Sequence, residues 1–164
     1  MRGIRVLGLS LGTRTIGMVT AELNCVFYTQ MKLFKDSWSE KKLQAILSAI
    51  DQYITKRNIK HIALKIPPHY SHSPAIVQLL TGIESLAKAK QVELHIFTLH
   101  NITQAWTEAE KTRVNKRQLV KIILEKYNLY HVYKKQANNK AGHYDKIFEA
   151  VGAADIVLRK LNNK

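Results

Sequence analysis

The sequence predicts an α/β fold: a five-stranded mixed sheet in the order β-β-β-α-β-α-β, then C-terminal helices, with helices on both faces of the sheet. Two observations lead to this prediction. Three apolar runs in residues 4–34 are joined by short turns, which is typical of an antiparallel meander. Two further apolar runs alternate with stretches of helical spacing, and a β-α-β-α-β order requires parallel crossovers. Beyond residue 100 the chain is predicted to be helical or looped.

The three N-terminal strands are predicted at residues 4–11, 15–22 and 25–34. The first run, IRVLGLSL, is almost continuously apolar, as expected for a strand that is buried on both faces. Cys25 stands in the apolar run CVFY, so we expect a packed thiol rather than a reactive one.

The next elements alternate between helix and strand. A helix begins at Ser39, and its apolar residues fall on one stripe. A short strand at residues 61–66 ends at a proline pair. Ser73-Pro74 begins a second amphipathic helix, since proline is favoured at the first helical position. A fifth strand is predicted at residues 93–100.

The C-terminal part contains two predicted helices and a loop. The first helix covers residues 118–127, and residues 130–144 form a polar, basic and partly aromatic loop. The last helix runs from about residue 145 to 161, with its apolar residues on one side. Because no linker interrupts the pattern, we expect a single domain over residues 1–164.

Charge is the unusual bulk property of this chain. Its 164 residues are 46% hydrophobic and 23% charged, which are ordinary globular proportions. However, 26 Lys and Arg face only 12 Asp and Glu, and the formal net charge is +14. Such an excess favours an anionic partner, most often a phosphate backbone. A solvated basic surface, an anionic membrane and an acidic protein are the alternatives.

The sequence also indicates the cellular compartment in which the protein works. Cys25 is the single cysteine, which excludes an intramolecular disulfide and favours a reducing compartment. No run reaches the 18 or so apolar residues of a membrane span, and the first residues lack the apolar region of a signal peptide. We therefore expect a soluble, cytoplasmic protein that does not span a membrane, and no membrane as its main partner.

The segment VLGLSLGTRTIGMVTAE (6–22) carries a family resemblance. It resembles the opening hairpin of RuvC-type Holliday-junction resolvases and related resolvase-like proteins of the RNase H-like superfamily, with matches at Gly8, Gly12, Thr13 and Gly17. HIALKIPP (61–68), ELHIF (93–97) and the alanine-rich last helix match in order and spacing. The resemblance implies an RNase H-like fold, a homodimer, and a Mg²⁺-dependent phosphodiesterase whose carboxylates hold two metal ions.

The residues at the implied acidic positions depart from the family pattern. The first-strand acid falls on Ser10, and the fourth-strand acid falls on Lys65. An ammonium group at a metal position repels a divalent ion by several kcal/mol at about 4 Å, even with an effective dielectric near 20. We therefore expect no catalytic residues and no metal cofactor. If the site is active, Asp145 and Glu149 would hold Mg²⁺.

The acids of the last helix have structural interpretations as well. Asp145 stands near the helix start, where an acid is favoured. Asp145 and Glu149 share a face by their spacing, and that face is predicted to lie almost opposite the apolar stripe. Asp155 borders the stripe and is expected to be an ion-pair partner. The pair His69 and His72 is interpreted as part of a loop, because no carboxylate or cysteine stands nearby in the sequence.

The surviving basic residues are the candidates for nucleic-acid binding. Lys65 in place of an acid would allow direct phosphate contact without an intervening Mg²⁺. Tyr130, Tyr133 and Tyr144 lie between basic residues and could stack on unpaired bases. The full candidate set is Arg14, Lys65, Lys111, Arg113, Lys116, Arg117, Lys134, Lys135, Lys140 and His143.

Four functions are therefore compared. The first is a catalytically inactive protein that binds nucleic acid, with DNA, including branched DNA, as the expected ligand. The second is an active, metal-dependent, structure-specific endonuclease that uses Asp145 and Glu149. The third is a phosphate-binding ATPase or sugar kinase, since GLSLGTRTIG also resembles a phosphate hairpin of the actin-like superfamily. The fourth is a non-catalytic dimeric interaction module.

Overall fold

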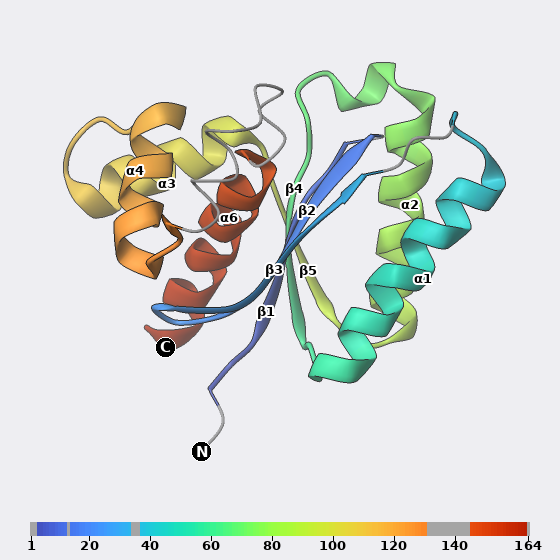
Figure 1. Ribbon diagram of the computed structural model, residues 1–164, viewed down its shortest axis with the longest axis horizontal. Coiled ribbons are helices and arrows are strands. Elements are labelled where there is room, and N and C mark those ends of the chain that lie inside the picture. Colours follow the sequence, from blue (N-terminus) through green and yellow to red (C-terminus); the bar gives the residue numbers. More distant parts are fainter. Residues whose placement is uncertain (1–2, 13, 34–36, 131–144, 164) are drawn as a thin grey trace.

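The computed structural model describes residues 3–12, 14–33, 37–130 and 145–163, with the side chains of residues 28–33 left out of the description. In these residues a five-stranded sheet lies between two layers of helices (Figure 1). The elements are β1 (Val6–Ser10), β2 (Thr15–Glu22), β3 (Cys25–Leu33), α1 (Glu40–Arg57), β4 (His61–Lys65), η1 (Tyr70–His72), α2 (Pro74–Ala89), β5 (Glu93–Phe97), α3 (Leu99–Glu110), α4 (Lys116–Tyr127) and α6 (Asp145–Asn162).

The sheet has the mixed topology that the sequence predicts. Its strand order is β3-β2-β1-β4-β5. The first three strands pair antiparallel as a meander, whereas β4 pairs parallel with both β1 and β5. The α/β class, the element order and the mixed five-stranded sheet are thus confirmed.

Helices cover both faces of the sheet, as predicted. Figure 1 shows α1 and α2 on one face and α3, α4 and α6 on the other. Each layer closes its own apolar core. Leu7 and Leu9 of β1 pack with residues of α1 and α2, and Val6 of the same strand packs with residues of α3, α4 and α6. Because side chains alternate between the faces of a strand, Ser10 faces the α6 layer with Val6.

Two glycines allow α6 to lie directly on the sheet. A Cβ atom on Gly8 would come 2.4 Å from the carbonyl oxygen of Ala150, and one on Gly17 would come 2.5 Å from that of Lys146. A Cβ atom does not approach a carbonyl oxygen this closely in real structures, so only glycine permits this contact. The helix therefore crosses β1 and β2 at backbone distance, and its side chains reach the ends of the central strands.

Several local predictions were wrong. Cys25 is exposed rather than packed, because it stands directly after the turn at Asn24, whose φ is 63°. The fifth strand ends at Phe97 rather than at residue 100. Thr98 caps α3 instead, in a capping box with Asn101, and such a cap satisfies the free N–H groups of a helix start.

The last helix is buried on more sides than the sequence suggests. Residues 147–155 of α6 are all buried, and Glu149 and Asp155 are among them. The prediction that the Glu149 face lies opposite the apolar side was therefore wrong. The reason is that α6 packs against the sheet as well as against α3 and α4. In the part of the chain that the structure describes, no helix has the length and apolar character needed to span a membrane.

Candidate functional site

The central feature of the site is the alignment of Ser10 with Lys65. Ser10 ends β1, Lys65 ends β4, and the two residues are direct neighbours in the parallel register. The carboxyl ends of the strands are the usual place for a ligand site in an open α/β sheet, and Ser10 and Lys65 both stand at such ends. Glu149 of α6 meets both side chains there, because the glycine contacts bring that helix onto the sheet.

One carboxylate oxygen of Glu149 accepts both polar contacts. The Ser10 hydroxyl donates to Oε2 at 2.8 Å, and the Lys65 Nζ lies 2.9 Å from the same atom. The Lys65 and Glu149 side chains are only 5% and 6% exposed, and Ser10 is fully buried. This is a buried ion pair with an additional hydrogen bond, which is the arrangement that a buried charge requires.

Two further lysines surround the pair. The half-exposed Lys116, the first residue of α4, lies 3.4 Å from Oδ2 of Asp145 and 3.4 Å from Oε1 of Glu149. Lys146 donates from Nζ to the carbonyl oxygen of Leu11 at 3.1 Å. We call Ser10, Lys65, Lys116, Asp145, Lys146 and Glu149 the Glu149 cluster.

The charges of the Glu149 cluster change the pKa values of its members. Burial opposes ionisation of Glu149, but the charge and hydrogen bond of Lys65, the Ser10 hydrogen bond and the charge of Lys116 outweigh it and lower its pKa. Burial and the Lys65 charge lower the pKa of Lys146. Burial also disfavours the charged form of Lys116, yet Glu149 and Asp145 outweigh it and raise its pKa. With all five groups ionised, three lysines face two carboxylates, and the cluster keeps one net positive charge.

A divalent ion of the kind implied by the family resemblance does not fit this cluster. Mg²⁺ takes hard oxygen ligands and octahedral geometry. Here Oε2 of Glu149 is already bonded to Ser10 and Lys65, and Oε1 contacts Lys116. A divalent ion about 4 Å from the Lys65 ammonium would meet a repulsion of about 8 kcal/mol at an effective dielectric near 20. The cluster is organised around ammonium groups.

Asp155 has a separate, structural role, as predicted. Its fully buried carboxylate lies 2.7 Å from Lys126 Nζ and 2.5 Å from Arg159 Nε, and the Tyr127 hydroxyl donates to it. Burial, together with the Asp155 charge and hydrogen bond, raises the pKa of Tyr127. Asp155 thus joins α4 to α6 and lies apart from the Glu149 cluster.

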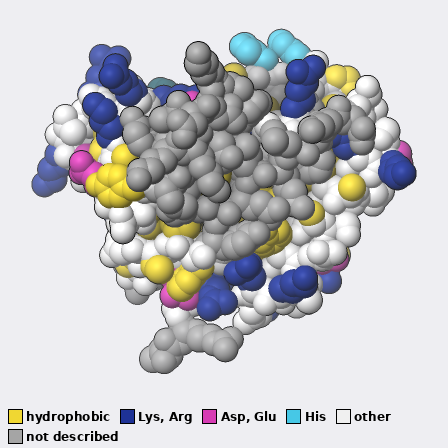
Figure 2. Space-filling model, in the orientation of Figure 1, with side chains coloured by type: hydrophobic (Ala, Val, Ile, Leu, Met, Phe, Trp, Pro, Cys, Tyr) yellow, Lys and Arg dark blue, Asp and Glu magenta, His cyan; other side chains and the backbone are white. Residues whose placement is uncertain are grey.

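The other predicted basic residues divide into two groups. Arg14, Lys111, Arg113 and Arg117 are exposed. Figure 2 shows dark-blue Lys and Arg side chains spread over the described part of one face, with some acidic side chains between them. Lys134, Lys135, Lys140 and His143, and with them Tyr133 and Tyr144, lie outside the described residues.

Sequence reasoning missed two features. Lys146 was not singled out, because its place against Gly12 depends on the crossing of α6 over the hairpin. His61, Glu93 and His95 were not connected either, although the structure brings their ligand atoms to within 4.8 Å of one another. The one available signal was the spacing of Glu93 and His95, which are two residues apart and therefore project from the same face of the strand. The exposed His69 and His72 instead stack on each other at η1.

Comparison with known proteins gives matches among solved structures. No family model and no curated protein matches the sequence. RuvC of Thermus thermophilus in complex with a Holliday junction substrate superposes with a TM-score of 0.72 at 11% identity, over 98% of this chain and 97% of that one. A second structure of Thermus thermophilus RuvC gives 0.69 at 9%, over 96% and 97%.

A resolvase from another organism superposes on this chain about equally well. The yeast mitochondrial Holliday junction resolvase Ydc2 superposes with a TM-score of 0.71 at 16% identity. The match covers 95% of this chain and 78% of that one. At such low identity the likeness extends to the fold alone.

Proposed function

The chain has the RuvC-like resolvase fold, and from this premise we propose that it binds nucleic acid at the Glu149 cluster without cutting it. The observation that carries the proposal is the buried Lys65–Glu149 pair, 2.9 Å apart. It places an ammonium group against the carboxylate at the ends of β1 and β4. In this proposal the Glu149 carboxylate pairs with the Lys65 ammonium group and does not bind a metal ion.

The cations of the cluster have different tasks in this proposal. Lys65 is 5% exposed, so in this proposal it neutralises Glu149 and does not make the direct phosphate contact expected from the sequence. Lys116 has a side chain that is 46% exposed, and it is the cation that contacts a phosphate. The N-terminal end of α4, which begins at Lys116, adds a partial positive charge at the same place.

The neighbouring exposed cations extend this surface. Lys111, Arg113 and Arg117 lie in or beside the connection between α3 and α4, and Arg14 follows Gly12 in the hairpin turn, against which Lys146 packs. Each phosphate neutralised by such a side chain releases a condensed counterion, so binding weakens steeply with salt. The formal charge of +14 supports a polyanion as the ligand.

The experiment is a salt series of DNA binding in chelator with two matched variants. K116A removes the exposed cation of the cluster. K88A removes an exposed lysine in the last turn of α2, at the opposite end of the sheet, just before β5 begins. Both variants change the net charge equally, so a difference between them reports position.

We expect K116A to reduce the slope of log K against log salt by about 0.9, the value for one phosphate contact. From about 50 to about 200 mM salt this makes the loss of affinity about 3.5-fold smaller than in the wild type. K88A should keep the wild-type slope. Equal slopes for all three proteins, or a reduced slope for K88A alone, would contradict phosphate contact at the cluster.

An active nuclease is the competing function, and one observation favours it. Asp145 and Glu149 both contact Lys116 at 3.4 Å, so two carboxylates do lie on one side of the cluster. A nuclease requires a divalent ion to displace Lys65 and Lys116 from these carboxylates. Cleavage that needs Mg²⁺ or Mn²⁺ and is lost in E149Q would establish this function in place of the proposed one.

A further inference from the structure

A second group of ligand atoms lies at the far end of the same strands. His61 begins β4 and Glu93 begins β5, and they are direct neighbours in the parallel register. His95 follows Glu93 by two residues and therefore projects on the same face. His61 precedes Lys65 by four residues along β4, which corresponds to about 13 Å. This group is therefore separate from the Glu149 cluster.

The three side chains converge at distances close to those around a tetrahedral metal ion, with the two imidazoles facing different oxygens of the Glu93 carboxylate. Nδ1 of His61 lies 3.4 Å from Nε2 of His95 and 3.6 Å from Oε2 of Glu93. Nε2 of His95 lies 3.7 Å from Oε1 of Glu93. Zinc binds imidazole nitrogen and carboxylate oxygen at about 2.0–2.2 Å. Ligands at the corners of such a tetrahedron are about 3.3–3.6 Å apart.

A hydrogen bond explains the two imidazoles less well. In ordinary hydrogen bonds from nitrogen donors, the donor and acceptor atoms are about 2.7–3.2 Å apart. The two ring nitrogens are 3.4 Å apart. The rings are tilted by 32° with centroids 5.6 Å apart, so they do not stack face to face. Nδ1 of His61 and Nε2 of His95 face each other at 3.4 Å, as two nitrogens that share an ion do.

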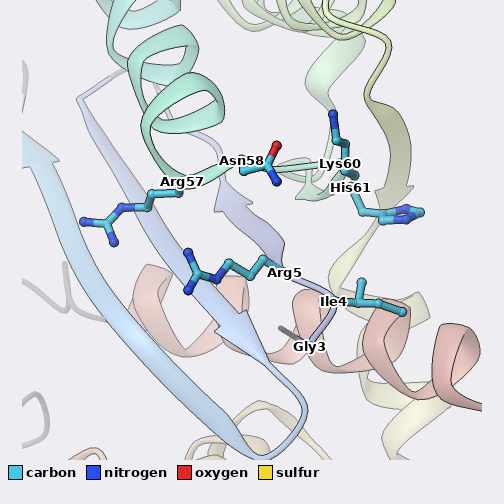
Figure 3. Close-up of a pocket in the computed structure, with 7 residues that line it drawn as sticks. All are labelled: Gly3, Ile4, Arg5, Arg57, Asn58, Lys60 and His61. Carbon is cyan, nitrogen blue, oxygen red and sulfur yellow. The ribbon is translucent and has the colours of Figure 1, made fainter. Parts of the chain in front are cut away.

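The surroundings leave the ion accessible. The His61 and His95 side chains are each 16% exposed, and Glu93 is 65% exposed, so the imidazoles are fixed by packing while the carboxylate side stays open. His61 also lines a pocket of about 280 Å³. In Figure 3 its ring points away from the guanidinium groups of Arg5 and Arg57.

We propose that His61, Glu93 and His95 bind one zinc-type transition-metal ion. Two imidazoles and one carboxylate suit Zn²⁺ and its neighbours in the first transition series, while Mg²⁺ prefers oxygen ligands and is not expected to bind here. The ion joins the starts of β4 and β5, and the fourth coordination position is left to water. This proposal is independent of nucleic-acid binding.

The test is a metal titration of the full, tag-free chain after chelation. We expect one Zn²⁺ per chain by calorimetry, a rise in Tm on adding Zn²⁺ and none on adding Mg²⁺, and the visible absorption of tetrahedral Co²⁺ when that ion is used. H95A and E93Q should lose at least tenfold in affinity, and circular dichroism of the metal-free proteins establishes that they fold.

A matched control separates this site from adventitious binding by histidine. H69A/H72A removes two exposed histidines but leaves the three proposed ligands in place, so it should bind Zn²⁺ as the wild type does. Three results would overturn the proposal: no stoichiometric Zn²⁺ binding, undiminished binding by folded H95A and E93Q, or loss of binding in H69A/H72A.

Discussion

Replacing Lys65 with methionine removes the cation of the buried pair and keeps most of the side-chain volume. In K65M, Glu149 retains the Ser10 hydrogen bond and the 3.4 Å contact with Lys116. It loses the 2.9 Å contact in surroundings where both side chains are at most 6% exposed. Breaking a buried ion pair from one side costs about 3–5 kcal/mol. Because Lys116 remains, we expect a loss of about 3 kcal/mol in the free energy of unfolding.

Chemical and thermal denaturation measure this loss. For a chain of this length, 1 kcal/mol corresponds to about 2–4 °C in Tm, so K65M should melt about 6–12 °C below the wild type. K90M is the matched control, because Lys90 and Asp51 are 3.1 Å apart but 41% and 40% exposed. An exposed pair contributes about 1 kcal/mol at most.

A double variant tests the mechanism of the loss. K65M/E149M removes both charges, and replacing a complete buried pair with apolar residues is often neutral or stabilising. It should regain most of the stability that K65M loses. The reasoning would be refuted if K65M unfolds within about 1 kcal/mol of the wild type, or if K65M/E149M is no more stable than K65M.

Three further predictions concern the packing and the pH response of the same region. G8A should lose about 3 kcal/mol in urea denaturation, because its Cβ would lie 2.4 Å from the Ala150 carbonyl oxygen and α6 would have to shift. D155N should lose about 3 kcal/mol in the same assay, because it leaves two cations beside a neutral side chain. The pKa of Glu149 is lower in the folded than in the unfolded chain, so its contribution to stability is present above the unfolded value and disappears as the pH falls through the folded one. Denaturation between about pH 6 and pH 3 should therefore show a smaller acid-dependent loss in E149Q than in the wild type; an equal loss would contradict this account.

The sequence was sufficient for the fold because its strands and helices differ in periodicity. The continuous apolar run of β1 and the apolar stripe of α1 at helical spacing are local signals. The strand β1 lies within the predicted residues 4–11, and α1 starts from the predicted Ser39 cap. The start of α3 was missed because the fifth strand was predicted to run through Thr98 to residue 100, across the residues of the helix cap. A capping box is a hydrogen-bond pattern, and hydrophobic spacing does not reveal it.

The candidate site was predictable residue by residue but not as a geometry. Ser10, Lys65 and Glu149 were identified from the family pattern, whereas their contact depends on how closely α6 approaches the sheet. That approach follows from Gly8 and Gly17, which the sequence marks only as part of a hairpin pattern. The meeting of His61 with Glu93 depends on the register of two parallel strands. These strands are joined by a long crossover, so no tight turn fixes their register in the sequence.

The most direct test of the central claim measures binding and cleavage of a labelled four-way DNA junction in the same samples, with the protein in excess. Linear duplex and single strand serve as comparison ligands, and each is incubated with Mg²⁺, with Mn²⁺ and with chelator. The account predicts salt-sensitive binding that persists in chelator and that Mg²⁺ or Mn²⁺ does not strengthen, and no cleavage product in any sample. Metal-dependent cleavage that E149Q abolishes would contradict it.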